Sequence, residues 1–243
     1  MKNVKSFKFI ILILGILLLS GCESKTNLLI TSDQKVIEET SAYQSNKVLS
    51  KYNTSVEAAL KQYGESYKDM ISPEDYSYKY TIGATTSFGT IYKTHKSLES
   101  FIDSTTFHGL YETALISHEK DGTSFKATGE NYIYILFEEP EGYGNSEAML
   151  TKVEVAIQFQ NKVLSNNADS YDEKTNTYTW IFTPNNQSKY IEFKIGKQMR
   201  YDIIFNYYLE HYLPIFIIGG IILLIALFGG LILYRKVRST NEI

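Results

Sequence analysis

Histidine and carboxylate side chains are the groups in this sequence of 243 residues that could carry hydrolytic or metal-dependent chemistry. The chain has four histidines: His95, His108, His118 and His211. Their spacing matches neither HExxH nor a close metal-binding pair, and we expect all four at the surface or in turns. Glu138, Glu139 and Glu141 surround Pro140 in a predicted solvated loop, where a calcium site would need further oxygen ligands. The sequence therefore predicts a protein that is not an enzyme and that holds neither a metal nor a cofactor.

The one cysteine, Cys22, ends an N-terminal segment with the layout of a secretory signal peptide. Three lysines precede an unbroken apolar run, residues 9–19, and small residues follow it. The stretch Leu19-Ser20-Gly21-Cys22 resembles the lipobox of bacterial lipoproteins. That resemblance implies removal of residues 1–21 and acylation of the Cys22 thiol by membrane lipid, which excludes Cys22 as a nucleophile. The alternative is an uncleaved membrane anchor in which Cys22 has no role.

A second apolar stretch lies near the C-terminus, where no charged residue occurs between Leu213 and Tyr234. About 20 such residues cross the hydrocarbon core as a helix. Basic residues follow in residues 235–243, which places this tail in the cytoplasm by the positive-inside rule. Residues 201–212 are rich in tyrosine, as expected for an aromatic juxtamembrane segment, and Pro214 suits the first turn of the helix. The sequence therefore predicts a transmembrane helix over residues 213–234 and an extracytoplasmic main domain.

The charge of that main domain limits its partners. Of 24 Lys and Arg residues, three lie in residues 1–22 and three in the tail, whereas among 27 Asp and Glu residues Glu242 alone lies outside residues 23–212. Residues 23–212 therefore carry a net charge near −8. Nucleic-acid-binding domains need basic patches that neutralise phosphates, so we expect no nucleic acid partner.

Residues 27–200 are predicted to form one extracytoplasmic α+β domain. Period-two alternation of apolar residues indicates about eight to ten strands, which we expect to pair as an antiparallel sheet. Two soluble helices are expected, over residues 56–70 and 97–102. Residues 22–26 are polar and are expected to form a short lipidated tether.

Two features of the predicted sheet bear on its topology and its surface. Residues 131–138 are predicted as a strand, and residues 178–182 with 189–195 as a final hairpin. Tyrosines recur at alternate positions in two of the strands: Tyr76, Tyr78 and Tyr80, then Tyr132 and Tyr134. Rings that line one sheet face suit either a core or a binding surface for lipid, glycan or peptide. The sequence leaves both interpretations open.

Several segments occur in an order known from one protein family. They are the lipobox, a strand–turn–strand over residues 27–39, a helix near Val56, a strand and helix over 89–101, a block over 161–180 and the terminal membrane helix. The most specific part is the pattern Val-x-Ser-Asn-Asn-Ala over residues 163–168, followed by Thr177-Tyr178-Thr179-Trp180. Together these segments resemble the LppM-type envelope lipoproteins. The resemblance implies a lipid-binding-like domain and a role in the bacterial envelope, but it identifies no ligand contacts.

These observations predict a lipoprotein of the bacterial cell membrane that is anchored by lipid at Cys22 and by a single span. Its external domain is expected to bind or organise an envelope lipid, a glycolipid or a membrane-protein partner. The alternative is an accessory or assembly subunit of a membrane complex that acts through residues 213–234. An envelope hydrolase would require histidine or glutamate side chains to converge in a cleft.

Overall fold

The computed structural model of the chain describes residues 23–71, 76–137, 151–186 and 189–240. The predicted signal peptide, Cys22 and the glutamate cluster at residues 138–141 lie outside the described residues. Contacts divide the chain into two units, one that ends at Met199 and one that begins at Arg200. The first unit is a mixed α+β structure built on two sheets, and the second is a long helix.

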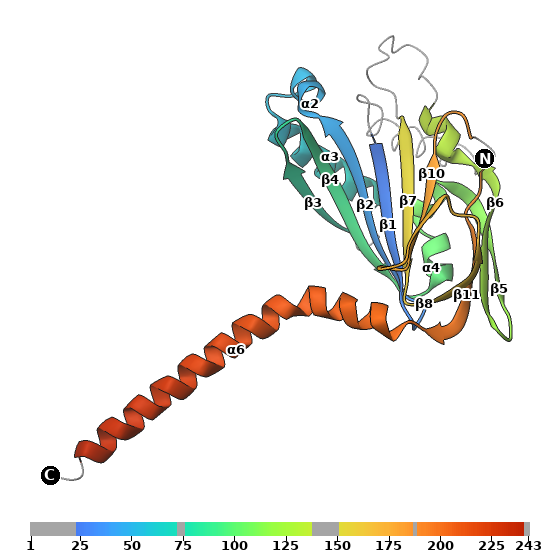
Figure 1. Cartoon of the computed structure of the whole chain (residues 1–243). Helices are drawn as coiled ribbons and strands as arrows, with labels where there is room; N and C mark the ends of the chain where they lie inside the picture. Colours follow the sequence, from blue (N-terminus) through green and yellow to red (C-terminus); the bar gives the residue numbers. More distant parts are fainter. Residues whose placement is uncertain (1–22, 72–75, 138–150, 187–188, 241–243) are drawn as a thin grey trace. The chain divides into compact units, whose positions relative to one another are not determined.

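The larger sheet of the first unit has seven strands (Figure 1). Their order is β3 (Ser77–Ile82), β4 (Thr86–His95), β2 (Val36–Ser45), β1 (Glu23–Ile30), β7 (Lys152–Phe159), β10 (Thr177–Phe182) and β9 (Ser170–Asp172). β1 is the central strand, paired antiparallel with β2 and parallel with β7. The expected all-antiparallel sheet is therefore wrong at β1–β7. A parallel pair needs a long crossover connection, and more than a hundred residues separate these two strands.

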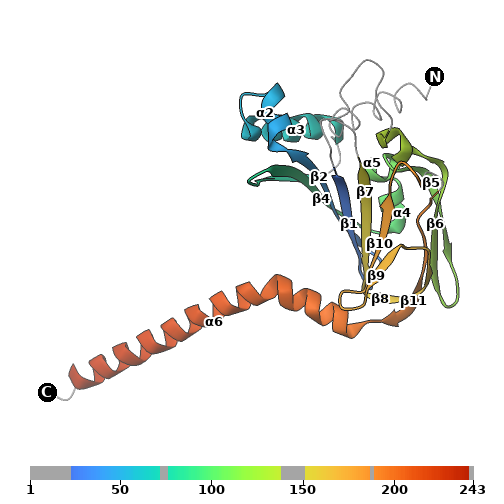
Figure 2. The same ribbon diagram turned by 45° about the horizontal axis from the view of Figure 1, so that its top comes forward.

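The smaller sheet has four strands in the order β5 (Tyr111–His118), β6 (Gly122–Asn131), β11 (Glu192–Met199) and β8 (Asn161–Asn166). Two short helices, α4 (Leu98–Ile102) and α5 (Thr105–His108), lie between β4 and β5 in the chain. Figures 1 and 2 show α4 in the space between the two sheets. Buried side chains from both sheets and from both helices form one continuous core.

The strand prediction is correct for most segments and wrong at three. The predicted final hairpin does not form, because β10 belongs to the larger sheet and β11 to the smaller one. Residues 132–137 form a 3₁₀ helix instead of continuing a strand. Residues 23–26 belong to β1 rather than to a tether, with Ser24 and Thr26 buried. Small polar side chains occupy the buried positions there, so hydropathy alone does not reveal the alternation.

Two further helices cover the outer strands of the larger sheet. α3 (Val56–Ile71) matches the predicted helix, whereas α2 (Asn46–Tyr52) was not predicted. The Tyr78 hydroxyl donates a hydrogen bond to the Leu60 carbonyl at 2.8 Å, and burial raises the pKa of Tyr78 to about 12. Tyr80 packs against the core cluster formed by α2 and α3. In this part of the sheet the tyrosines fill the space beneath α3, which favours the core interpretation.

Gly64 lets α3 lie close to the sheet, because a methyl group there would lie 2.4 Å from Cδ1 of Tyr78. Alanine normally stabilises a helix interior relative to glycine by about 1 kcal/mol. We expect the reverse for Gly64→Ala, a loss of about 1–3 kcal/mol in the free energy of unfolding from overpacking. The measurement is a urea titration of the full chain in detergent micelles, followed by Trp180 fluorescence. The exposed control Gln62→Ala should leave the transition in place, and a more stable Gly64→Ala would contradict this packing.

The block over residues 161–180, which is part of the sequence resemblance, has a structural explanation. Asn167 Oδ1 accepts hydrogen bonds from the Trp180 indole N–H at 2.6 Å and from the Glu192 amide at 3.0 Å. Its Nδ2 atom donates to the Tyr190 carbonyl at 2.7 Å. One side chain thereby connects β10 of the larger sheet with the start of β11 in the smaller sheet. The block that carries the sequence resemblance therefore fixes a corner of the fold.

Replacement of Asn167 tests this corner. Asn167→Ala leaves the buried indole N–H of Trp180 without its acceptor, which costs about 1–3 kcal/mol of unfolding free energy. Asn167→Asp keeps the acceptor oxygen and loses the donor, so we expect a smaller loss. The stabilities of the two variants and the unmodified chain are compared through their urea unfolding midpoints, measured on the full chain in detergent. Equal stability of the alanine variant and the unmodified chain would show that the corner does not depend on Asn167.

The second unit consists of α6 (Tyr201–Thr240), which contains Pro214 in its interior rather than in its first turn as predicted. Among the described residues, no single helix is both long enough and apolar enough to qualify as a bilayer span. Two consecutive stretches of α6, Tyr201–Ile215 and Ile217–Gly229, qualify when taken together, and they meet at an angle of 42°. The span over residues 213–234 stays a prediction.

Candidate ligand-binding site

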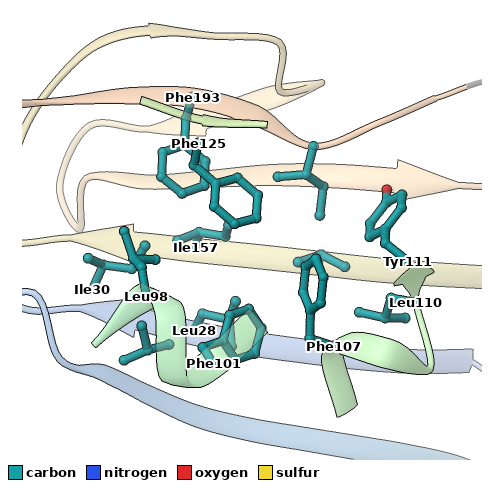
Figure 3. Close-up of a pocket in the computed structure, with 13 residues that line it drawn as sticks. Leu28, Ile30, Leu98, Phe101, Phe107, Leu110, Tyr111, Phe125, Ile157 and Phe193 are labelled. Carbon is teal, nitrogen blue, oxygen red and sulfur yellow. The ribbon is translucent and has the colours of Figure 1, made fainter. Parts of the chain in front are cut away.

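An apolar cavity of about 20 Å³ lies inside the first unit, between the two sheets (Figure 3). Its lining side chains are Leu28, Ile30, Val36, Leu98, Phe101, Phe107, Leu110, Tyr111, Phe125, Val155, Ile157, Ile191 and Phe193. A volume of this size holds about one water-sized sphere. Figure 3 shows Leu98, Phe101 and Phe107 approaching from the α4–α5 side, with Phe125 and Phe193 on the opposite side.

Aromatic rings form most of the wall between the helices and the smaller sheet. Phe107 lies edge-on to both Phe101 and Phe125, at centroid distances of 5.5 and 6.2 Å. Phe125 stacks on Phe193 at 4.8 Å. Both short helices are capped by serine side chains, at Ser97 and Ser104, which fixes where each phenylalanine enters the space.

A wider cleft of about 260 Å³ lies next to this cavity at the end of β1. The two spaces share Ile30, and they continue each other along β6 and β11, where Phe125 and Phe193 line the cavity and Thr123 and Ile195 line the cleft. Thr31, Ser32, Gln34, His118, Glu119, Gly122, Asn161, Gly196, Lys197 and Met199 complete the lining of the cleft. The space between the sheets is thus apolar inside and of mixed polarity toward its end.

Charged groups around the cleft are largely compensated. Lys194 Nζ lies 2.8 Å from Glu119 Oε2 and 2.9 Å from Asp121 Oδ1. Hydrogen bonding to Lys194 lowers the pKa of both carboxyl groups. Asn161 donates to the Gly196 carbonyl at 3.0 Å, while its own Oδ1 atom is buried and accepts no hydrogen bond from the described residues. The lining of the cleft therefore combines uncharged polar groups and apolar walls with the side chains of Glu119 and Lys197.

Of the four histidines, His118 is the one that lines the cleft. Its Nδ1 atom lies 3.2 Å from Thr123 Oγ1 and its Nε2 atom 3.1 Å from Glu99 Oε1. The first contact follows from the hairpin, in which His118 and Thr123 are directly opposite each other. The Glu99 and His118 side chains are 50% and 59% exposed, so both stay hydrated. In a catalytic triad the base and its carboxylate partner lie in a site that excludes water. The line of Thr123, His118 and Glu99 is open to water instead.

His95 contradicts the expectation that all four histidines lie at the surface or in turns. It is buried on β4, and its Nε2 atom lies 2.7 Å from Oε2 of the fully buried Glu38 on β2. Thr106 of α5 donates to the same carboxylate at 3.0 Å, and Thr40 donates to Oε1 at 3.1 Å. The sequence does hold a signal for this group, because Glu38 falls between Val36 and Thr40 on the inward face of a strand. A buried charge is stable when it is paired and hydrogen bonded in this way.

The Glu38 cluster connects α5 to the larger sheet, so its loss should destabilise the unit. We expect Glu38→Ala to lower the free energy of unfolding by about 3–5 kcal/mol, because His95 and the two threonines lose their common partner. The neighbouring variant Glu39→Ala, on the opposite face of β2, should cost less than about 1 kcal/mol. Urea titrations of the full chain in detergent measure both. Losses of equal size would contradict the role assigned to the cluster.

The remaining sequence predictions place no further group in the cleft. His108 and His211 are exposed, as expected, and each contacts a nearby backbone carbonyl, of Glu112 and Tyr207 respectively. Within the described residues, no three histidine, cysteine, aspartate or glutamate side chains converge on a metal-sized site. The cleft itself could not be read from the sequence, because its walls come from segments more than a hundred residues apart.

Comparisons with known proteins add little to this description. No protein-family model matches the chain, and no curated protein matches its sequence. Among solved structures, the folded domain of LppM from Mycobacterium tuberculosis, determined by NMR, is a structural neighbour with a TM-score of 0.42 and 12% identity. The match covers 76% of this chain and 94% of that domain. A likeness at this level establishes neither a family nor a function for the chain.

Proposed function

We propose that the chain is a membrane-displayed lipoprotein whose α+β unit binds an amphiphilic envelope lipid or glycolipid and catalyses no reaction. The supporting observation is the polarity of the space between the sheets. An apolar cavity borders, at Ile30, on a wider cleft whose lining holds both uncharged polar and charged groups. This arrangement matches an amphiphile, whose apolar chain would occupy the cavity and whose polar headgroup would occupy the cleft.

Binding of an acyl chain requires the cavity to enlarge, because about 20 Å³ holds no more than a water-sized sphere. The elements best suited to move are α4 and α5, which are five and four residues long. Strands β1 and β7 are hydrogen bonded on both edges, so displacement of a short helix costs less free energy than separation of these strands. The helices contribute Phe101 and Phe107 to the wall, and their displacement would widen the cavity directly.

Photo-crosslinking tests this proposal. The full chain is placed in phospholipid nanodiscs that contain a phosphatidylglycerol with a diazirine at mid-chain, and crosslinked peptides are mapped by mass spectrometry. We expect crosslinks in peptides that contain Phe101, Phe107 or Phe125, in addition to those in α6 that any membrane helix would give. Ile30→Ala should increase the labelling of the inter-sheet peptides at least twofold, and Ile30→Phe should reduce it by a similar factor.

The two Ile30 variants carry opposite expectations, so misfolding cannot produce both results. Ile82→Ala is the matched control, because Ile82 is 50% exposed at the edge strand β3 and away from the cavity lining. Labelling confined to α6 in all variants would refute lipid binding between the sheets while leaving membrane insertion in place. Equal labelling of the inter-sheet peptides in both Ile30 variants would refute the route past Ile30.

A further inference from the structure

The first turns of α6 carry a stripe of aromatic side chains. Tyr201, Phe205, Tyr208 and Tyr212 follow one another at intervals of four, three and four residues, which places them on one helical face. Their exposed fractions are 74%, 64%, 52% and 46%. Tyr208 and Tyr212 stack at a centroid distance of 5.7 Å. The stripe is thus a continuous aromatic surface.

A polar stripe runs along another face of the same segment. Asp202, Asn206 and Glu210 recur at intervals of four residues, and all three are exposed. On a helical projection with 100° per residue, their mean direction lies more than 90° from that of the aromatic stripe. The segment is therefore amphipathic, in contrast to residues 213–234, which are apolar on every side.

The length of the aromatic stripe distinguishes two orientations at a bilayer. Twelve helical residues extend over about 18 Å. The headgroup region on each side of the hydrocarbon core is only about 5–8 Å deep. A helix that stood upright on the membrane would hold Tyr201 and Phe205 in water, far outside the layer in which tyrosine is favoured. A helix that lies in the plane of the interface would place all four rings in that layer.

The bend in α6 supplies about half of the change of direction that the second orientation needs, and tilt of the following segment in the bilayer would supply the rest. Tyr201–Ile215 and Ile217–Gly229 meet at 42°, directly after Pro214 (Figure 1). Proline lacks the N–H that would bond to the Glu210 carbonyl, and its ring clashes with that carbonyl, which kinks a helix at this point. The break follows the turn that Pro214 weakens, and it lies within a few residues of the boundary between the amphipathic segment and the apolar one.

We propose that residues 201–212 form an interfacial helix that lies in the plane of the membrane–water boundary, with its aromatic stripe turned toward lipid. This inference rests on the proposed function, because it requires residues 213–234 to cross the bilayer. Lipid is the occupant of the stripe because the chain enters the hydrocarbon core directly after Tyr212. Tyrosine rings combine an apolar body with a hydroxyl, which matches the boundary between acyl chains and water.

Quenching by brominated lipid tests the orientation. The full chain is reconstituted into vesicles of phosphatidylcholine and phosphatidylglycerol with acyl chains brominated near their first double-bond position. Phe205→Trp and Asn206→Trp are adjacent in sequence and lie on opposite stripes, so they form a matched pair, and Ile222→Trp marks the predicted span. The unmodified chain gives the contribution of Trp180, the only native tryptophan.

We expect strong quenching of Ile222→Trp, and quenching of Phe205→Trp that is at least twice that of Asn206→Trp. Equal and weak quenching of the pair, with Ile222→Trp still quenched, would show that the helix stands out of the bilayer and would overturn this inference alone. Equal and strong quenching of the pair would place the whole segment in the hydrocarbon core and would also overturn it. An unquenched Ile222→Trp would refute the span on which this inference rests, whereas lipid binding between the sheets is decided separately by the crosslinking experiment.

Discussion

The structure of the first unit depends on the pairing of β1 with a neighbour on each edge. β2 supplies a local antiparallel partner, whereas β7 comes from a distant part of the chain and pairs in parallel, Glu23 with Lys152 and Ile30 with Phe159. The register has a direct consequence for the interior. A shift of one residue would turn Leu28 and Ile30 away from the core and replace them with Asn27 and Leu29. The apolar cavity and the cleft beside it both need Ile30 on the inner face.

Local physical chemistry accounts for the parts of the fold that the sequence predicts well. α3 has apolar residues at helical spacing, and β5 and β6 form a hairpin joined by residues 119–122, so both are determined within a short stretch. The parallel pairing of β1 and β7 and the separation of β10 from β11 depend on contacts between distant segments. Strand periodicity carries no information about which distant strand becomes the neighbour, so these features could not be derived from one sequence.

The candidate site likewise has features that the sequence indicates and features that depend on distant contacts. The sequence indicates an apolar inner face on β1 and β7, but the cleft arises where the ends of β1, β6 and β11 meet, and no local pattern marks that meeting. The spacing of histidines along the chain does not reveal the buried pair of Glu38 and His95, because the two residues lie on neighbouring strands. Strand alternation is the better guide, since it places Glu38 on the inward face, where a carboxylate requires a partner. Asn167 is a different case. It lies in a sequence block that is distinctive by itself, and the structure shows that its side chain connects the two sheets.

The two proposed attachment points belong to opposite ends of β1. Cys22 directly precedes Glu23, the first residue of the strand, whereas Met199, the last residue of the first unit, lines the same cleft as Ile30. A strand of eight residues is about 26 Å long. Because β1 begins at Glu23, the chain has no tether after Cys22 that could span this distance. If Cys22 is acylated as proposed, the Glu23 end of β1 is therefore held next to the lipid, and the cleft with Ile30 lies at the other end of the strand.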